Sequence, residues 1–352
     1  MKILNKKYLT PVGCFKKILL NDEKSLRLIL TGKCNLACEF CIYKVKDFYS
    51  PEIHSPDFIE MRPTKSLKNV LKAMKKSLGF NIVQLTGGEP TLAKNLLEIA
   101  KILKDTGFRV NLCSNLTVVK PLLHLLENDL LNELTFSYLP LDAKGQRKKL
   151  PGCKRPSQTR IKKIMENILY LKSHFPNLII KTNIIISPFT DTNDFTEFVH
   201  WCWRNDIIPR AQRDRSSSRI SGSTKKMLNL LVFLNVRPEK VILRIPGSTE
   251  LCEFKNSSGK IIYVKIFNKN FRPEKICKFC DRKNKCGKSL SNIRIYDTKN
   301  GPVLCFCTEH NEKFAHLNIK QFLKSEVLAE IKDYRKNKLS YFTKFCANYN
   351  FQ

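Results

Sequence analysis

Three cysteines near the start of the chain have a spacing that suits an iron–sulfur cluster. They lie in the segment TGKCNLACEFC, residues 31–41, where Cys34, Cys38 and Cys41 form a C-x3-C-x2-C pattern. Three thiolates can bind three irons of a 4Fe–4S cube and leave the fourth iron without a protein ligand. A metal position that the protein leaves open can bind a cofactor or a substrate, as in catalytic zinc sites. The alternative interpretation is a zinc site with a distant fourth ligand.

A second motif, Gly87-Gly88-Glu89-Pro90, follows the apolar segment Ile82–Leu85. We expect that segment to be a β-strand. Two glycines let the backbone approach another group closely, and the carboxylate of Glu89 can accept hydrogen bonds from an ammonium group. On its own the motif could be an ordinary strand-to-helix turn. Its place after the cysteine segment makes the combination far more specific than either motif alone.

The second cysteine group lies in the last quarter of the chain and has the pattern C-x2-C-x5-C, followed by a strand-like segment, Ile293–Tyr296, and two further cysteines. Its members are Cys277, Cys280, Cys286, Cys305 and Cys307. C-x2-C pairs flanked by basic residues are typical of zinc and Fe–S sites. A structural zinc ribbon is the alternative interpretation. The sequence leaves open whether Cys286 or Cys307 completes the site.

The composition is that of a folded protein that binds metal rather than one held by disulfides. The chain has 352 residues, is 42% hydrophobic and contains 14 cysteines. No apolar run approaches the roughly 18–20 residues that span a bilayer, and the N-terminal segment lacks a signal-peptide cleavage pattern. We therefore expect a cytoplasmic location, no membrane partner and thiols that bind metal. The six isolated cysteines are expected to be small buried residues: Cys14, Cys113, Cys153, Cys202, Cys252 and Cys346.

The formal net charge of +32 is compatible with a small anionic substrate or an acidic partner. Such a charge also raises the question of nucleic acid. The lysines are scattered along the chain and we find no RNA- or DNA-binding motif, so the sequence argues against a nucleic-acid partner. A non-enzymatic metal scaffold that binds RNA is kept as a hypothesis from another functional class.

Apolar and amphipathic segments alternate between residues 25 and 212, which predicts parallel βαβ units. The expected strands are Leu26–Leu30, Ile82–Leu85, Val110–Leu112, Leu134–Tyr138, Leu178–Ile186 and Ile207–Ala211. The expected helices are Ser66–Leu78, Leu92–Asp105, Val119–Leu126, Ile161–Ser173 and Asp194–Arg204. The fold class is therefore α/β, and the periodicity alone fits either a doubly wound sheet or a partial barrel.

Four parts are expected along the chain: an N-terminal segment (1–24), an α/β domain (25–212), a linker with a helix (213–240) and a C-terminal cysteine-rich region (241–352). The polar segments 141–160 and 213–224 are predicted to be loops. Beyond them we expect a helix at Thr224–Leu234, strands at Val241–Ile245 and Ile261–Phe267, and a final helix at Ile319–Lys336.

The cysteine segment, with the aromatic Phe40 before its last cysteine, and the GGEP motif together resemble the radical S-adenosylmethionine (SAM) superfamily. The resemblance implies a partial (β/α)6 barrel with chemistry at the carboxyl ends of its strands. It implies that SAM chelates the open iron of a catalytic 4Fe–4S cluster and that a reductant such as flavodoxin or ferredoxin supplies the electron that cleaves it. The residues that this resemblance places at SAM are Phe40, Gly87, Gly88, Glu89, Pro90, Ser114, Asn115 and Asn183. No side chain stands out as a catalytic acid or base.

The C-terminal region resembles the GTP 3′,8-cyclases of molybdenum-cofactor synthesis. By that resemblance Cys277, Cys280 and Cys305 bind an auxiliary 4Fe–4S cluster, and two arginines, Arg27 and Arg294, hold the phosphates of an anionic substrate. For both arginines an ordinary salt-bridged or surface role is the alternative. The implied activity is radical chemistry on a small, phosphorylated, nucleotide-like molecule.

This chain also departs from the cyclases. Cys286, at an x5 spacing that resembles the SPASM/twitch clusters of peptide-modifying enzymes, would close the second cluster if it is a ligand. Asn292 stands where the cyclases have a second arginine, and the Gly-Gly end of the cyclases is absent from Asn348–Gln352. The alternative function is therefore peptide or protein modification, although the stretch before Cys34 is too short for a leader-peptide-binding domain.

Overall fold

The computed structural model describes residues 16–36, 38, 41, 56–139, 158–214, 220–245, 249–267, 293–306, 316–338, 340 and 342. Its strands are β1 (Lys17–Asp22), β2 (Ser25–Ile29), β3 (Phe58–Ile59), β4 (Ile82–Thr86), β5 (Arg109–Ser114), β6 (Glu133–Tyr138), β7 (Ile179–Ile186), β8 (Ile208–Arg213), β9 (Arg237–Ile245), β10 (Thr249–Lys255), β11 (Ile261–Phe267), β12 (Arg294–Thr298) and β13 (Gly301–Cys305). Its helices are α2 (Lys65–Leu78), η3 (Pro90–Leu92), α3 (Leu96–Asp105), α4 (Lys120–Glu127), α5 (Gln158–His174), α6 (Thr192–Arg204), α7 (Ile220–Phe233), α10 (Ile319–Leu323) and α11 (Glu326–Lys336). Within these residues no helix is long and apolar enough to cross a membrane.

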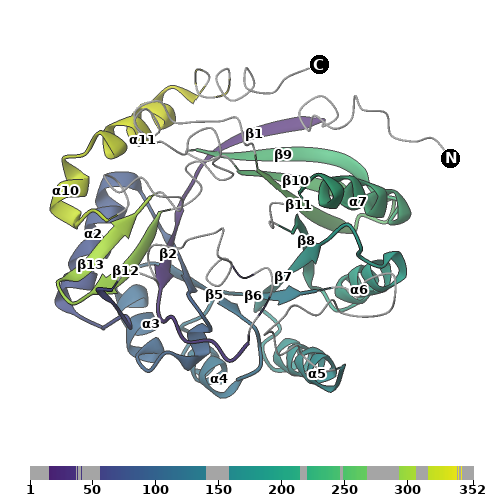
Figure 1. The fold of residues 1–352 in the computed structure, drawn as a ribbon, viewed down its shortest axis with the longest axis horizontal. Coiled ribbons are helices and arrows are strands. Elements are labelled where there is room, and N and C mark those ends of the chain that lie inside the picture. Colours follow the sequence, from purple (N-terminus) through teal and green to yellow (C-terminus); the bar gives the residue numbers. More distant parts are fainter. Residues whose placement is uncertain are drawn as a thin grey trace.

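The centre of the fold is a run of six parallel strands in the order β2-β4-β5-β6-β7-β8. Each strand is followed by a helix on the outside of the curve, as Figure 1 shows for α2 to α6. Parallel neighbours need such crossovers because the chain must return from the end of one strand to the opposite edge of the sheet, where the next strand begins. The expected partial (β/α)6 barrel is confirmed.

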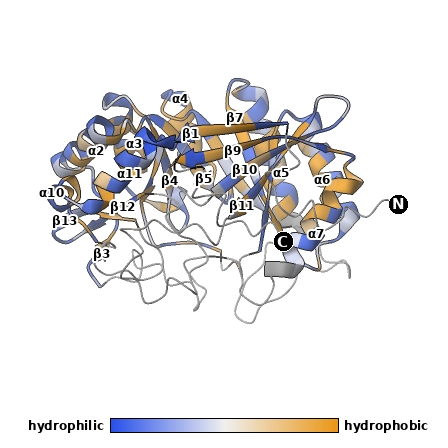
Figure 2. Ribbon diagram, turned by 90° about the horizontal axis from the view of Figure 1, so that it is seen from above, coloured by the Kyte–Doolittle hydropathy of each residue, from blue (hydrophilic) through white to orange (hydrophobic). Residues whose placement is uncertain are grey.

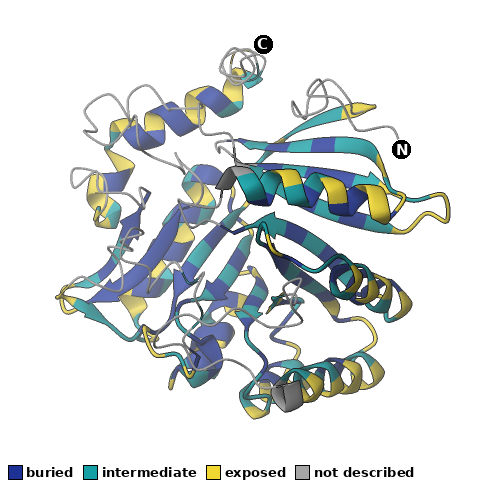
Figure 3. Ribbon diagram, turned by 45° about the vertical axis from the view of Figure 1, so that its right-hand side comes forward, coloured by how far each residue is buried: buried dark blue, intermediate teal, exposed yellow. Residues whose placement is uncertain are grey.

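Alternate residues along these strands point to the helices. On β2, β4 and β5 the fully buried leucines and valines share one hydrophobic core with the helices: Leu26, Leu28, Val83, Leu85, Val110 and Leu112. Figure 2 shows helices with both apolar and polar stretches, and Figure 3 shows buried and exposed residues alternating along them. The other set of strand residues faces away from the helices, and we call that side the inner face of the barrel.

Three antiparallel strands continue the sheet beyond β8. Strand β11 pairs with β8 in parallel, β10 joins β11 and β9, and β1 adds to β9 in parallel. Only two residues separate β1 from β2, so the chain itself joins the two sides of the sheet. Glu23 and Lys24 form this junction: the Glu23 N–H donates to the carbonyl of Ile245 (2.7 Å), and the Lys24 carbonyl accepts from Ile82 (3.1 Å).

Arg335 of α11 secures the same junction from outside the sheet. Its guanidinium donates to the backbone carbonyls of Glu23, Leu78 and Ile245. These carbonyls belong to the β1–β2 junction, the end of α2 and the end of β9, so one side chain ties three parts of the fold together. Helix α11 therefore stabilises the base of the barrel.

On the opposite side of the run, β12 pairs in parallel with β2 and antiparallel with β13 and β3. All the described strands thus belong to one 13-stranded sheet. The sheet continues across the boundaries proposed from the sequence at residues 24 and 240, so the expected parts share one hydrogen-bonded scaffold in the described residues. The division into four parts stays a prediction.

Four predicted segments are wrong in their bounds. Helix α5 begins at Gln158, inside the segment 141–160 expected to be a loop, and the helix expected at Leu92–Asp105 begins only at Leu96. The single helix expected at 319–336 is two helices, because Ser325 lies in an extended conformation and its side chain caps α11 by accepting from the Leu328 N–H (3.3 Å). In the segment 213–224, expected to be a loop, Arg213 ends β8 and α7 begins at Ile220.

Candidate active site

The GGEP turn lies directly on the backbone that leads into the cysteine segment. The Gly88 N–H donates to the Thr31 carbonyl (2.7 Å), and the Glu89 N–H donates to the Lys33 carbonyl (2.7 Å). A Cβ on Gly88 would lie 2.0 Å from the Lys33 oxygen, and one on Gly87, whose φ is +135°, would lie 2.4 Å from the Thr31 oxygen. Both positions therefore require glycine, because only a residue without a side chain allows the two backbones to come this close.

Glu89 joins the ends of two neighbouring strands. Its carboxylate accepts from the Thr91 N–H (3.1 Å) and hydroxyl (2.7 Å), from the Ser114 hydroxyl (2.9 Å) and from the Asn115 N–H (2.7 Å). The residue is 1% exposed. A buried carboxylate with this many donors holds its surroundings rigidly. The structure gives Glu89 a bracing role between the GGEP turn and the end of β5, and its contact with SAM stays a prediction.

A chain of amide and hydroxyl groups connects the end of β5 to the cysteine segment. The Asn115 side-chain amide donates to the side-chain carbonyl of Asn35 (2.9 Å), and Asn35 in turn donates to the Thr117 hydroxyl (2.8 Å). The Thr117 hydroxyl donates back to Asn115 (2.6 Å). Asn35 stands next to Cys34, so this network helps to position the first cysteine. Ser114 and Asn115, both candidates from the sequence, are thereby brought to the site.

The three cysteines of the first group are partly exposed thiols without disulfide partners. The Cys41 N–H donates to the Cys38 carbonyl (3.2 Å), and the Leu36 N–H donates to the Cys34 sulfur (3.4 Å). Hydrogen bonds to sulfur are a usual feature of Fe–S sites. Among the described residues no three His, Cys, Asp or Glu side chains converge on a single metal ion. Such convergence is not required for a cubane cluster, whose thiolates each bind a different iron. Phe40 lies outside the described residues.

Two arginines that the sequence paired only by resemblance lie side by side. Arg27 of β2 is in register with Arg294 of β12, and Arg294 is in register with Cys305 of β13. Residues in register on adjacent strands point to the same side of a sheet. The three residues thus share one side although 278 positions separate Arg27 from Cys305 in the sequence. Arg294 is 3% exposed and Cys305 is fully buried. The cysteines expected with Cys305, namely Cys277, Cys280 and Cys286, lie outside the described residues, as do Cys307 and Asn292.

The inner face carries further polar side chains that sequence reasoning missed. Arg210 of β8 donates to the side-chain carbonyl of Asn183 on β7 (2.7 Å), and Gln84 of β4 donates to the Cys113 sulfur on β5 (3.0 Å). Burial lowers the pKa of the Arg210 guanidinium, and Arg27 lowers it further, whereas Cys113 acts in the opposite sense. The sequence did contain a pattern that could have identified these residues. Buried parallel strands are usually continuous apolar runs, so a polar residue at every second position of such a strand indicates that the inside of the barrel is polar.

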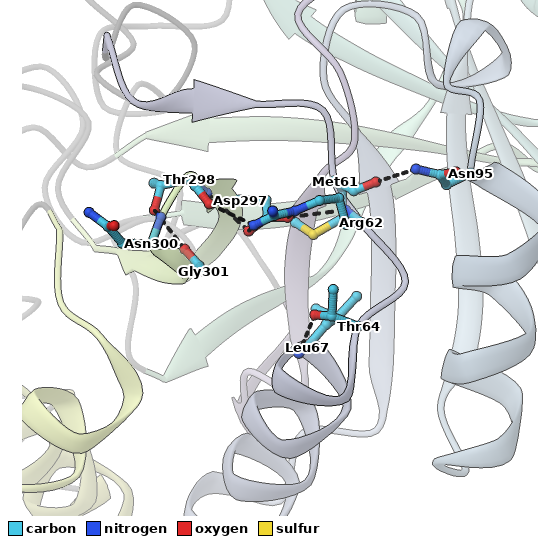
Figure 4. Close-up of polar contacts among 9 residues, drawn as sticks. All are labelled: Met61, Arg62, Thr64, Leu67, Asn95, Asp297, Thr298, Asn300 and Gly301. Atoms are coloured by element: carbon cyan, nitrogen blue, oxygen red, sulfur yellow. Dashed lines mark hydrogen bonds and ion pairs between the residues drawn. The ribbon is translucent and has the colours of Figure 1, made fainter.

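The C-terminal strands are clamped to the segment between the cysteine segment and α2. Arg62 makes a two-pronged pair with the buried carboxylate of Asp297 through Nε (2.8 Å) and Nη2 (3.2 Å), and donates to the Thr298 carbonyl (2.8 Å). Figure 4 shows this pair beside Met61, whose carbonyl accepts from Asn95. The Met61 N–H donates to the Leu30 carbonyl (2.8 Å), one residue before the TGKC sequence. The β12–β13 hairpin is therefore coupled to the backbone that enters the cysteine segment.

Comparison with known protein families agrees with this arrangement. Residues 28–202 match the model of the Radical SAM superfamily. The chain contains a radical SAM domain. This match covers the cysteine segment, the GGEP turn and the strands from β4 to β7 with their helices.

Curated relatives match parts of the chain at modest identity, and a solved structure shares its fold. The chain is 29% identical to the GTP 3′,8-cyclase of Haemophilus ducreyi over 160 residues, which are 42% of this chain and 45% of that protein. It is 32% identical to a probable GTP 3′,8-cyclase of Saccharolobus islandicus over 105 residues, 30% of this chain and 31% of that protein. The matches span less than half the length of these relatives. The structure of anSMEcpe with bound AdoMet aligns with a TM-score of 0.50 at 13% identity, over 87% of this chain and 82% of that one, and shares the fold.

The radical SAM domain implies SAM and a 4Fe–4S cluster as cofactors, and the described residues fit both. Cys34, Cys38 and Cys41 supply thiols on one segment. The Gly87-Gly88 turn lies at the carboxyl end of β4, where the fold places its chemistry, and packs directly against the backbone that leads into those thiols. A second, auxiliary cluster stays a prediction, since only Cys305 of its expected ligands is described.

Proposed function

We propose that this protein is a radical SAM enzyme that cleaves SAM reductively and abstracts a hydrogen atom from a small anionic, nucleotide-like substrate. The 4Fe–4S cluster and SAM supply a 5′-deoxyadenosyl radical when bound. The residues of this chain supply the rest: the three thiols bind the cluster, the GGEP turn holds the cysteine segment in place, and Ser114, Asn115 and Asn183 line the SAM site. The proposal includes a flavodoxin or ferredoxin as reductant and a cytoplasmic location, where unpaired thiols persist.

The observation that carries the substrate class is the register of Arg27 with Arg294 across β2 and β12. Two guanidinium groups on adjacent strands repel each other, and burial in a medium of low dielectric increases that cost. An anion between them would offset the repulsion, and guanidinium forks match phosphate oxygens in pairs of hydrogen bonds. Arg210 adds another guanidinium group, close enough to Arg27 for the two charges to affect each other. A substrate with at least two negative charges satisfies this arrangement best.

The experiment is a panel of nucleotides, headed by GTP, tested for stimulation of 5′-deoxyadenosine formation by anaerobically reconstituted protein with dithionite and SAM. One nucleotide should raise the rate above the uncoupled background. Arg27→Gln and Arg294→Gln should each lose that stimulation and keep the background rate, because both residues lie on strands β2 and β12 and not in the cysteine segment. Arg237→Gln, an exposed arginine at the start of β9, is the matched control and should behave as wild type.

Peptide or protein modification is the second candidate, supported by the spacing of Cys286 and by the net charge of +32. The same assay separates the two functions. Cleavage of SAM that no nucleotide stimulates, with unchanged behaviour of both arginine variants, would contradict the nucleotide-like substrate and move the search to peptides encoded nearby.

A further inference from the structure

Four exposed lysines lie at the edge of the barrel that carries the cysteine segment. Lys33 comes directly before Cys34, and its side chain is 65% exposed. Lys65 begins α2, Lys94 lies two residues before α3 and Lys120 begins α4, and all three are exposed. Each of these helices follows a barrel strand, so each begins at the carboxyl edge of the sheet. We call these four residues the lysine edge.

Glu60 connects two members of the lysine edge through one carboxylate. Its Oε2 lies 3.5 Å from the Lys33 ammonium, and its Oε1 accepts from the Lys94 N–H (2.6 Å). The next residue, Asn95, donates to the Met61 carbonyl (3.0 Å), as Figure 4 shows. The chain just before α3 is therefore held beside Lys33, on the backbone that enters the cysteine segment.

The other two members are tied to the same edge by the residues before them. The hydroxyl of Thr117, three residues before Lys120, accepts from the exposed Asn35 of the cysteine segment (2.8 Å). Lys65 follows Thr64, whose side chain caps α2. The lysine edge therefore brings together four parts of the chain around one segment.

The positions of Lys65 and Lys120 are unfavourable for their own helices. The amino end of a helix carries a partial positive charge, so acidic residues stabilise it and cations destabilise it. In α2 and α4, which the structure describes in full, the first residue is a lysine and the first turn contains no acidic residue. Helices α3 and α6 instead have Glu98 and Asp194 in their first turns. A local arrangement that folding disfavours is expected where it serves function.

We propose that the lysine edge is the docking surface for a small acidic protein that carries a one-electron cofactor, of the flavodoxin or ferredoxin class. The inference rests on the proposed function, which needs such a donor. Complementary charge steers partners together and raises association rates about 10- to 1,000-fold. The thiols of the first cysteine group are partly exposed, on the segment that the lysine edge flanks. A protein docked here brings its cofactor close to them.

The step that this surface serves is the transfer of one electron. The reduced cofactor of the partner loses one electron, and the cluster bound by the three thiols gains it. No covalent bond of this chain forms or breaks. The lysines act only by holding the partner, so they should matter for a protein donor and not for dithionite, a small reductant that needs no docking surface.

The test reverses charge at the lysine edge in Lys65→Glu/Lys120→Glu. Both carboxylates would lie at helix amino ends, where negative charge is favourable, so the variant should fold. Lys76→Glu/Arg109→Glu is the matched control. It makes the same change in charge at exposed residues of the opposite edge, in the last turn of α2 and at the start of β5.

The first readout is the affinity of a bacterial flavodoxin for anaerobically reconstituted protein, measured by calorimetry at low ionic strength. The lysine-edge variant should lose about tenfold in affinity, and the control should bind as wild type. Added salt should weaken binding to wild type, because salt screens exposed charges. The second readout is 5′-deoxyadenosine formation. The lysine-edge variant should be slower with reduced flavodoxin and should equal wild type with dithionite.

The proposal is overturned if the lysine-edge variant keeps wild-type affinity for flavodoxin or if the control loses as much. A matching loss of the dithionite-driven rate would also contradict it, because the lysines would then serve the cluster or SAM. Tight binding of an RNA oligonucleotide at the lysine edge, without binding of flavodoxin, would reject the redox partner in favour of nucleic acid. Absence of 5′-deoxyadenosine with dithionite in every protein tested would instead overturn the proposed function, so the two failures are distinguishable.

Discussion

The contact between Gly88 and Lys33 predicts that Gly88→Ala disables the cysteine segment. The new Cβ would lie 2.0 Å from the Lys33 oxygen and 2.6 Å from its carbonyl carbon, where distances below 3.0 Å essentially never occur. Both atoms are backbone, so relief requires a shift of the cysteine segment by about 1 Å rather than a side-chain rotation. That shift breaks the bonds from Gly88 to Thr31 and from Glu89 to Lys33, both 2.7 Å.

The magnitude follows from those two effects. Overpacking of this kind costs about 1–3 kcal/mol, and each lost backbone hydrogen bond adds about 1 kcal/mol, so the junction loses roughly 3–5 kcal/mol. A displacement of about 1 Å at a reacting centre costs on the order of 100-fold in rate. We expect 5′-deoxyadenosine formation to fall about 100-fold, with a reduced iron content after reconstitution.

Gly79→Ala is the matched control. Gly79 ends α2 at φ +61°, and a Cβ there meets nothing within 4 Å. Alanine in this left-handed conformation costs about 1–2 kcal/mol far from the cysteine segment. The control should lose some stability in urea and keep its iron content and its rate. Normal iron content and normal SAM cleavage in Gly88→Ala would refute the claim that the GGEP turn positions the cysteines.

Three further predictions test the scaffold. Glu89→Gln replaces a carboxylate oxygen by an NH2 group that faces donors, and should lower the unfolding free energy by about 1.5–3 kcal/mol; an unchanged urea midpoint would contradict the bracing role. Arg62→Met leaves the buried Asp297 without its two-pronged partner and should cost about 1.5–3 kcal/mol, measured in the same way, whereas equal stability would show that the clamp is dispensable. Burial raises the pKa of Glu250 to about 8, and among the described residues neither of its oxygens has a hydrogen-bond partner. The folded state therefore binds a proton that the unfolded state has lost above pH 4.5, so stability should decline by up to about 1.4 kcal/mol per pH unit between pH 4.5 and 8. Glu250→Gln should remove that slope, and an unchanged slope would exclude Glu250 as its source.

The six barrel strands could be predicted because each is an apolar run between amphipathic helices. Strands β1 and β10 escaped prediction for two physical reasons. Strand β1 is short and combines apolar with polar residues. Its partner β9 begins 220 residues later in the chain, so no local sequence pattern predicts the pairing. Strand β10 contains two glutamates and a threonine, and its place between β9 and β11 depends on tertiary pairing rather than on its own composition.

Of the candidate site, too, one part could be predicted from the sequence and another part could not. The closeness of the GGEP turn and the cysteine segment could be expected, because both follow neighbouring parallel strands. The side-by-side placement of Arg27 and Arg294 could not be derived from spacing, since it depends on β12 adding to β2. Sequence reasoning treated Cys113 as a buried small residue, and only the register and the Gln84 contact place it on the inner face.

The central claim is that Cys34, Cys38 and Cys41 hold a cluster that cleaves SAM. The most direct measurement is 5′-deoxyadenosine formation with dithionite and SAM by anaerobically reconstituted wild type, by each of the three Cys→Ala variants and by Cys202→Ala. The account predicts product from wild type and Cys202→Ala and none above background from the three variants, because no other described residue replaces a lost ligand in that segment. Wild-type amounts of product from any one of the three variants would contradict it.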